Sequence, residues 1–236
     1  MIKKNIKAVL FDFGGTLDHD GDSWGIRLYK QFNNAGLKIN KNDYKDAEKR
    51  SMDQLFDNKV SATLAYKETV DIYIYWIIKN LKLIIKDYKK VLVKPFCLES
   101  LHYLERNKII LDKLSEKFTL GIISNNFGNC EGWCNEFEMT NFFKIIIDSN
   151  IVGYKKPDKR IFKFSCIKMG FPLDECIYIG DKYKTDIKPI LELGMNPIWI
   201  NNSDKRHDID NKVIKIKTLL DLENIFDLKD QSKLLI

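Results

Sequence analysis

The sequence of 236 residues has no long uninterrupted apolar run, no block of like charges and no internal repeat. Its most apolar long segment, residues 70–85, is broken by Asp71, Lys79 and Lys82. Because a membrane span needs about 20 mostly apolar residues, we predict that this segment is a buried helix of a soluble protein. The basic first residues are followed by a short apolar run, residues 8–11. Because this run is too short for a signal peptide, we expect a cytoplasmic protein.

Cysteine is also scarce, with five residues that are scattered and odd in number. Cys130 and Cys134 lie four residues apart on a predicted helix, but no second Cys or His pair could complete a zinc site. We therefore interpret all five cysteines as free thiols. The net charge of +6 comes from lysines spread along the chain, without a basic stripe interleaved with aromatic residues. We therefore expect no nucleic-acid partner and no membrane partner, and a monomer or homodimer.

Five short apolar runs, each followed by polar turn residues and then by a helical pattern, indicate the fold class. They are Ala8–Phe11, Leu120–Ile123, Lys144–Ile147, Cys176–Ile179 and Pro197–Ile200. Strands that alternate with helices and are buried on both faces are typical of a parallel sheet with right-handed crossovers. The pattern predicts an α/β fold with a doubly wound, Rossmann-like parallel-sheet core.

A long helical stretch separates the first predicted strand from the second, which begins near Phe118. Its helical segments are residues 23–35, 43–57 and 61–85. We predict that they form an α-helical cap domain inserted into the core. The predicted domains are a core of residues 1–19 and 93–236 and a cap of residues 20–92. The chain is expected to return to the core near Pro95, followed by a helix from Leu101 to Leu114, and the tail near residues 218–226 to form a last helix.

Chemically useful side chains cluster where the predicted strands end. Ligands of an open parallel sheet bind beyond the carboxyl ends of its strands. The groups at these positions are Asp12–Leu17, Ser124–Asn126, Gly153–Asp158 (before a helix through residue 169) and Gly180–Asp186. Each group alone could be ordinary turn chemistry. Their occurrence together at one end of one sheet predicts a functional site.

The uncharged and nucleophilic members of these groups suit phosphoryl transfer. A carboxylate such as Asp12 can attack phosphorus and form an aspartyl-phosphate intermediate. The backbone of Gly14 and Gly15 allows N–H groups to approach phosphate oxygens closely, and Ser124 and Asn125 offer further donors.

The charged members fit the same reaction. Lys156 can neutralise charge on both the nucleophile and the phosphoryl group. Asp181 and Asp12 together supply the hard oxygen ligands that Mg²⁺ prefers. The lysine and the cation would reduce the repulsion between an attacking carboxylate and an anionic phosphate, so catalysis would rest on positioning and electrostatics.

This ordered set of residues resembles the haloacid dehalogenase-like hydrolase superfamily, in particular its phosphatase-like subfamily I, which has a helical (C1) cap between the first and second motifs. The resemblance extends from about Ala8 to Ile200. It implies a Mg²⁺-dependent phosphoric monoester hydrolase that acts on a small phosphorylated metabolite.

The resemblance also implies the roles of individual residues. Asp12 matches the nucleophile, Ser124 the hydroxyl of the second motif and Lys156 the lysine of the third. The implied metal ligands are Asp12, the carbonyl oxygen of Gly14, Asp181 and Asp186, of which Asp186 would act through a water molecule or by orienting Lys156. The implied substrate-binding residues are Gly15, Thr16, Ser124, Asn125 and Lys156.

The sequence departs from the phosphatase pattern at Gly14, where the superfamily usually has an Asp that serves as general acid. Such an acid is typically worth about 10²–10⁴-fold in rate. Three explanations are open. The first is that another group, such as Asp18, His19, Asp20 or a cap residue, supplies the proton. The second is that the leaving group needs no proton, or that the reaction is not ester hydrolysis, as in phosphonoacetaldehyde hydrolases. The third is that the protein binds a phosphorylated ligand without turnover. Dehalogenation, which needs no metal, fits the retained Asp181 and Asp186 less well.

The predicted cap is rich in aromatic residues, which we interpret mostly as packing between its helices. Its arginines, Arg27 and Arg50, are expected at the surface. Neither the substrate nor the cap residues that would contact it follow from the sequence.

Overall fold

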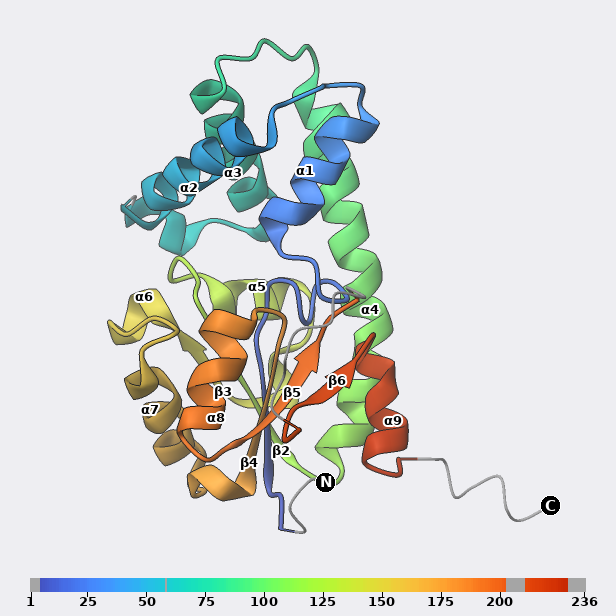
Figure 1. Cartoon of the computed structure of the whole chain (residues 1–236), viewed down its shortest axis with the longest axis vertical. Helices are drawn as coiled ribbons and strands as arrows, with labels where there is room; N and C mark the ends of the chain where they lie inside the picture. Colours follow the sequence, from blue (N-terminus) through green and yellow to red (C-terminus); the bar gives the residue numbers. More distant parts are fainter. Residues whose placement is uncertain (1–4, 58, 203–210, 229–236) are drawn as a thin grey trace, which may run out of the picture.

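The computed structural model describes residues 5–57, 59–202 and 211–228, in which a group of helices lies beyond one end of a parallel sheet (Figure 1). The strands are β1 (Ala8–Phe11), β2 (Thr119–Ser124), β3 (Phe143–Asp148), β4 (Cys176–Gly180), β5 (Asn196–Ile200) and β6 (Ile214–Ile216). The α-helices are α1 (Trp24–Asn34), α2 (Lys41–Asp57), α3 (Tyr66–Asn80), α4 (Lys94–Ser115), α5 (Cys130–Glu136), α6 (Ser149–Val152), α7 (Lys159–Met169), α8 (Lys188–Glu192) and α9 (Leu222–Ile225). Single-turn elements are η1 (Lys59–Thr63), η2 (Lys89–Val93), η3 (Thr140–Phe142), η4 (Leu173–Glu175), η5 (Tyr183–Ile187) and η6 (Leu219–Asp221).

The six strands are all parallel and follow the order β3-β2-β1-β4-β5-β6. The predicted doubly wound α/β core is thus confirmed. β1 lies between β2 and β4, and Phe11 at its end is level with Ile122 and Ile179. The strand order reverses direction at β1, which is where ligands bind in open α/β sheets. The residues that follow β1 therefore lie at the favoured binding position.

Both faces of the sheet are buried. Val9 and Phe11 belong to the larger hydrophobic core on the side of α4, whereas Ala8 and Leu10 pack with residues of α7 on the opposite side. Successive side chains of a strand point to opposite faces, so a short strand with no polar residue must be covered on both sides.

The segment predicted as an inserted cap is helical and contains α1, α2, η1 and α3, which lie above the carboxyl ends of the strands (Figure 1). α3 buries an apolar stripe that includes Tyr73, Ile74 and Ile77, and these residues share one hydrophobic core with the α4 side of the sheet. α4 is long enough to run from the cap down the side of the core (Figure 1). The cap thereby packs directly onto the edge of the candidate site.

Several predicted boundaries were wrong. α3 ends at Asn80 rather than near Ile85, and Lys82 beyond it has a left-handed φ of 54°, which an α-helix does not accommodate. α4 begins at Lys94 rather than Leu101, because Pro95 occupies the first turn, where its missing N–H costs no hydrogen bond. The short strand β6 was not predicted, since three residues give too little periodicity. None of the described helices is long and apolar enough to cross a membrane.

Candidate active site

The sheet brings the predicted site residues to one edge. Asp12 directly follows β1, Ser124 is the last residue of β2, and Asp181 directly follows β4. The N–H of Asp12 donates to the carbonyl of Ile179 at 2.9 Å, which continues the β1–β4 ladder by one residue. Asp12 Oδ1 accepts a hydrogen bond from the N–H of Phe13 at 2.7 Å. The orientation of the Asp12 carboxylate is therefore set by the strand end itself.

Lys156 reaches this edge from the loop between α6 and α7. Its Nζ lies 2.8 Å from Asp12 Oδ2 and 2.9 Å from Asp186 Oδ1. It also donates to the hydroxyl of Tyr178 at 2.8 Å. Burial opposes the charge on Lys156, but Asp12 and Asp186 outweigh it and raise the pKa of the lysine. Lys156 is therefore a fixed cation directly beside the Asp12 carboxylate.

The side chain of Asn125, predicted to bind substrate, contacts the backbone of Lys156. Its Nδ2 donates to the carbonyl of Lys156 at 2.9 Å, and its Oδ1 accepts from the N–H of Lys156 at 2.7 Å. Both ends of the amide thus bind the backbone of the lysine. Asn125 still lines the cavity described below, but the contacts of its side chain position Lys156.

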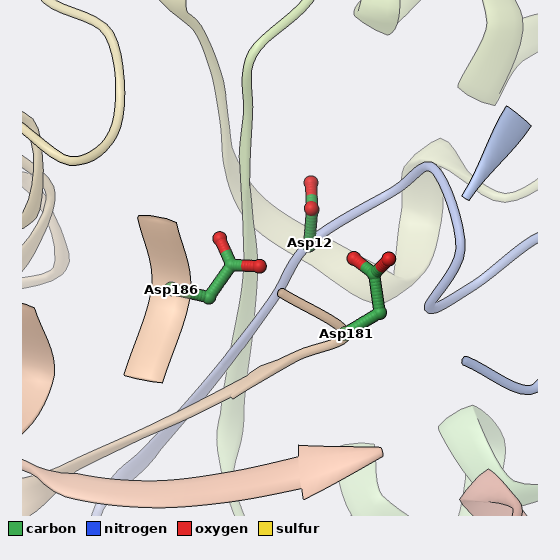
Figure 2. A group of neighbouring side chains, drawn as sticks. All are labelled: Asp12, Asp181 and Asp186. Carbon is green, nitrogen blue, oxygen red and sulfur yellow. The ribbon is translucent and has the colours of Figure 1, made fainter. Parts of the chain in front are cut away.

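The carboxylates of Asp12, Asp181 and Asp186 lie close together at this edge (Figure 2). Oxygen atoms of Asp12, Asp181 and Asp186 all lie within 4.8 Å of one another, and all three residues are buried. Asp181 Oδ1 is buried and has no hydrogen-bond partner, and burial raises the pKa of Asp181 well above its usual range. A buried, unpartnered carboxylate oxygen among like charges is costly unless a cation satisfies it. The donor set, all hard oxygen, fits Mg²⁺.

Two glycines allow these acids to approach the backbone. A Cβ at Gly15, whose φ is 86°, would lie 2.6 Å from Asp181 Oδ2. A Cβ at Gly180 would lie 2.7 Å from that of Asp186. Any side chain at either position would displace a carboxylate, so the glycines make room for the acid cluster.

Gly15 and Thr16, predicted to bind substrate, lie beside the cavity rather than among the residues that line it. The N–H of Gly15 donates to Asp18 Oδ1 at 2.6 Å, and that of Thr16 to the carbonyl of Phe13 at 3.2 Å. These two N–H groups are therefore used within the loop.

A cavity of about 130 Å³ opens above Asp12. Its polar lining includes Ser124, Asn125 and Lys156 from the core. Ser23, Glu48 and Lys182 also line it. Its apolar wall is formed by Phe13, Trp24, Met52, Phe127 and Trp133. Trp24 and Trp133 are stacked, with ring centroids 5.5 Å apart. The cavity thus combines one charged end with an aromatic wall.

Gly14 also lines the cavity, and Trp24 lies directly against it. A Cβ at Gly14 would be 3.6 Å from the indole Nε1, which is an ordinary contact distance. The indole N–H donates to Asp18 Oδ2 at 2.7 Å, which fixes the ring. The space next to Gly14 is therefore occupied by a fixed aromatic ring of the cap.

Asp18 is a buried acceptor in the contact between the core and the cap. In addition to Gly15 and Trp24, it accepts from Arg27 Nη1 at 3.0 Å and from the Tyr66 hydroxyl at 3.0 Å. With both oxygens used in this way, Asp18 is badly placed to deliver a proton to a substrate. Arg27, expected at the surface, is instead only 2% exposed. That prediction was wrong because a buried carboxylate pairs with it; Arg50 is exposed as expected.

The other two acids considered in place of Gly14 are also engaged elsewhere. His19 Nδ1 accepts from the N–H of Asp22 at 3.2 Å, and burial lowers the pKa of His19. Asp20 binds Arg106 in a bidentate ion pair at 2.8 and 2.6 Å. Neither residue lines the cavity.

Sequence reasoning missed several residues of the site. Tyr178 lies within a predicted strand, and only the tertiary structure places its hydroxyl on Lys156. Glu48 and Lys182 line the cavity, Glu48 from the cap helix α2 and Lys182 from the loop after β4. Lys182 follows Asp181 directly and could have been noticed; nothing in the sequence of α2 distinguishes Glu48. All five cysteines are free, as predicted.

Comparison with known proteins agrees with this geometry. The sequence model of the haloacid dehalogenase-like hydrolases matches residues 9–200, so the chain belongs to this family. The chain is 26% identical to the glyceraldehyde 3-phosphate phosphatase of Methanocaldococcus jannaschii, over 94% of this chain and 96% of that protein.

Solved structures share the fold. The HAD-hydrolase YfnB of Bacillus subtilis, bound to magnesium, has a TM-score of 0.57 at 20% identity and covers 95% of this chain and 100% of that one. A dehalogenase with an intermediate complex has a TM-score of 0.64 at 15% identity and covers 94% of this chain and 98% of that one. At these identities the likeness supports the fold alone.

Proposed function

We propose that the protein is a Mg²⁺-dependent phosphatase that hydrolyses a small phosphorylated metabolite through an aspartyl-phosphate on Asp12. The observation that carries the proposal is the convergence of Asp12, Lys156, Asp181 and Asp186 beside a cavity that Asp12 and Lys156 line. Family membership and the phosphatase activity named for the M. jannaschii relative support the same reaction class.

The chemistry follows from these positions. One Asp12 oxygen attacks phosphorus, the bond to the leaving oxygen breaks, and water later cleaves the aspartyl-phosphate to release inorganic phosphate. Lys156 holds Asp12 in place and offsets negative charge near the phosphoryl group. Ser124, which lines the cavity, is positioned to donate to a phosphoryl oxygen. Mg²⁺, held by Asp12, Asp181, Asp186 and the Gly14 carbonyl, would supply charge neutralisation to the phosphate oxygens.

The cavity limits the class of substrate. Its charged end suits a phosphate, and its aromatic wall favours a partly apolar organic group on that phosphate. The three-acid cluster also makes metal-independent dehalogenation the weaker alternative, because such a reaction would leave Asp181 Oδ1 without a partner.

An aryl phosphate assay tests the proposal. The wild-type protein with Mg²⁺ is expected to hydrolyse p-nitrophenyl phosphate, and Asp12→Asn is expected to abolish turnover because the amide is not a nucleophile. EDTA should abolish it as well.

Turnover that persists in Asp12→Asn or in EDTA would refute the mechanism. Thermal stabilisation by inorganic phosphate without turnover of any phosphate ester would instead indicate a phosphate-binding protein that is not an enzyme.

A further inference from the structure

Because residue 14 is a glycine, the chain lacks the family's usual proton donor for the leaving oxygen of the substrate. The structure places one carboxyl group on the cap side of the cavity. That group is Glu48, on the second turn of helix α2. We propose that Glu48 is the general acid that protonates the leaving oxygen, a role that rests on the proposed phosphatase function.

The location of Glu48 follows from close packing between two cap helices. Its carboxyl group lies against Gly25 in the first turn of α1, so that a Cβ at Gly25 would be 2.9 Å from Glu48 Oε1. Gly25 follows Trp24, the residue whose ring covers Gly14. Glu48 and Gly14 therefore line one cavity, and the adjacent residues Trp24 and Gly25 lie against Gly14 and Glu48 respectively.

Hydrogen bonds within the cap fix the carboxyl group. The hydroxyl of Tyr73, on α3, donates to Glu48 Oε1 at 3.1 Å. Tyr44, one turn earlier on α2, donates to the carbonyl of Gly25 at 2.8 Å and holds α1 against α2. Glu48 is thus a positioned side chain rather than a freely rotating surface acid.

Its surroundings also favour the protonated form. Burial raises the pKa of Glu48, although the Tyr73 hydrogen bond and the charge of Lys182 oppose this effect, and the charge of Asp53 adds to it. A carboxyl group with a raised pKa retains its proton closer to neutral pH, as a general acid requires.

The remaining cavity groups are poorer candidates. Ser23 and Thr185 carry hydroxyl protons that are far too weakly acidic, and Lys182 is a cation suited to hold phosphate rather than to release a proton. Asp12, Ser124 and Lys156 are already used on the phosphoryl side.

The proton balance is complete. As the Asp12 oxygen bonds to phosphorus and the P–O bond to the leaving group breaks, Glu48 gives its proton to that oxygen and the alcohol departs. When water attacks the aspartyl-phosphate, the Glu48 carboxylate takes one proton from it and is restored.

The test compares two substrates whose leaving groups differ in their need for a proton. sn-Glycerol 3-phosphate releases an alkoxide unless it is protonated, whereas p-nitrophenyl phosphate releases a stable phenolate. Glu48→Gln is expected to lower kcat/KM for the first by about 10²-fold and for the second by less than about threefold. Its melting temperature should stay close to that of the wild type.

The pH profile gives a second readout. For wild type, kcat/KM on glycerol phosphate should fall as pH rises through the pKa of Glu48, because the acid form is then lost. This dependence should be absent in Glu48→Gln, which never carries the titrating proton. Titration of the neighbouring groups affects kcat/KM for both substrates equally, so the comparison with p-nitrophenyl phosphate cancels it. These groups are Lys182, Asp53, Tyr73 and Tyr44.

Two further variants complete the design. Asp46→Asn removes one negative charge from an exposed position of the same helix and should leave both rates unchanged. Gly25→Ala, which keeps the helix but forces the carboxyl group of Glu48 to move, should lower the ratio of glycerol phosphate to p-nitrophenyl phosphate turnover.

An unchanged ratio in both Glu48→Gln and Gly25→Ala overturns the role of Glu48. Equal losses of kcat/KM on both substrates overturn it as well, because kcat/KM covers only the steps up to the aspartyl-phosphate, in which the two substrates differ in their need for a proton. If the wild type hydrolyses neither substrate, the proposed phosphatase function fails and the role of Glu48 fails with it.

Discussion

At the scale of single residues, the site depends on side chains that hold other side chains in place. Lys156 receives the most support, since Asn125 binds its backbone on both sides and Asp12, Asp186 and Tyr178 surround its ammonium group. If Lys156 neutralises the proposed nucleophile Asp12, its exact position matters, because a displacement of about 1 Å can cost about 10²-fold in rate.

Asn125→Ala is therefore expected to lower kcat by roughly 10²-fold, since the loop that carries Lys156 loses both contacts. The unpaired N–H of Lys156 should also cost about 1–3 kcal/mol of stability. Steady-state kinetics and urea unfolding would measure these two effects.

Asn196→Ala is the matched control. Asn196 also binds two backbone groups, the carbonyls of Asp174 and Cys176, but at the opposite end of the sheet. It should lose stability without losing activity. A similar loss of activity in both variants would contradict the positioning role of Asn125.

At the scale of secondary-structure elements, the cap is attached to the core by a buried ion pair. Arg27 of α1 contacts Asp18 from the core loop at 3.0 Å, and it also donates to the carbonyl of Phe96 and the hydroxyl of Ser100 on α4. The same Asp18 fixes Gly15 and Trp24, so one buried carboxylate connects the loop after β1 with two cap helices, and Arg27 extends this network to α4. The orientation of α1 over the cavity depends on this network.

Arg27→Met should destabilise the protein by about 3–5 kcal/mol, because it leaves the carboxylate of Asp18 buried and unpaired. Lys30→Met, on the same helix, removes an ion pair with Asp22 that is largely exposed and should cost less than about 1 kcal/mol. Urea midpoints would measure both.

The double variant Asp18→Asn/Arg27→Met provides the control for the charge itself. It should be more stable than Arg27→Met alone, since the unpaired charge of Asp18 is removed as well. If the double variant is the less stable of the two, packing of the arginine side chain rather than charge pairing explains the effect.

At the scale of the whole molecule, three carboxylates and one lysine lie together where the parallel strands end. Their mutual repulsion opposes folding in the absence of a cation, and we expect a bound Mg²⁺ to offset it. The fold thus carries its functional site at a cost to its own stability.

Saturating Mg²⁺ should accordingly raise the melting temperature by roughly 5–10 °C, as expected for about 2.7 kcal/mol at a concentration of 100 Kd. Asp181→Asn should raise the melting temperature of the metal-free protein, because one of the repelling charges is removed. It should also lose most of the response to Mg²⁺. Differential scanning calorimetry with and without Mg²⁺ would test both statements.

A full Mg²⁺ response in Asp181→Asn would exclude this residue as a ligand. Asp46→Asn again serves as the control for a general effect of charge, and its response should match that of the wild type.

The sequence alone predicted the α/β core, and it pointed to the candidate site residues that the structure brings together. Short apolar strands followed by polar groups specify a parallel sheet, and a parallel sheet brings all strand ends to one edge; Asp12, Ser124 and Asp181 could therefore be placed together from their order. These are local signals, because each depends on a few consecutive residues and on the geometry of one kind of sheet.

Only the tertiary structure decided what surrounds that edge. The helices of the cap have no strand register, and their placement over the core follows from packing between side chains distant in sequence. The burial of Arg27, the hold of Asn125 on Lys156 and the position of Glu48 beside Gly25 all result from such packing. The proposed nucleophile could therefore be inferred from the sequence, whereas the proposed proton donor for the leaving group required the structure.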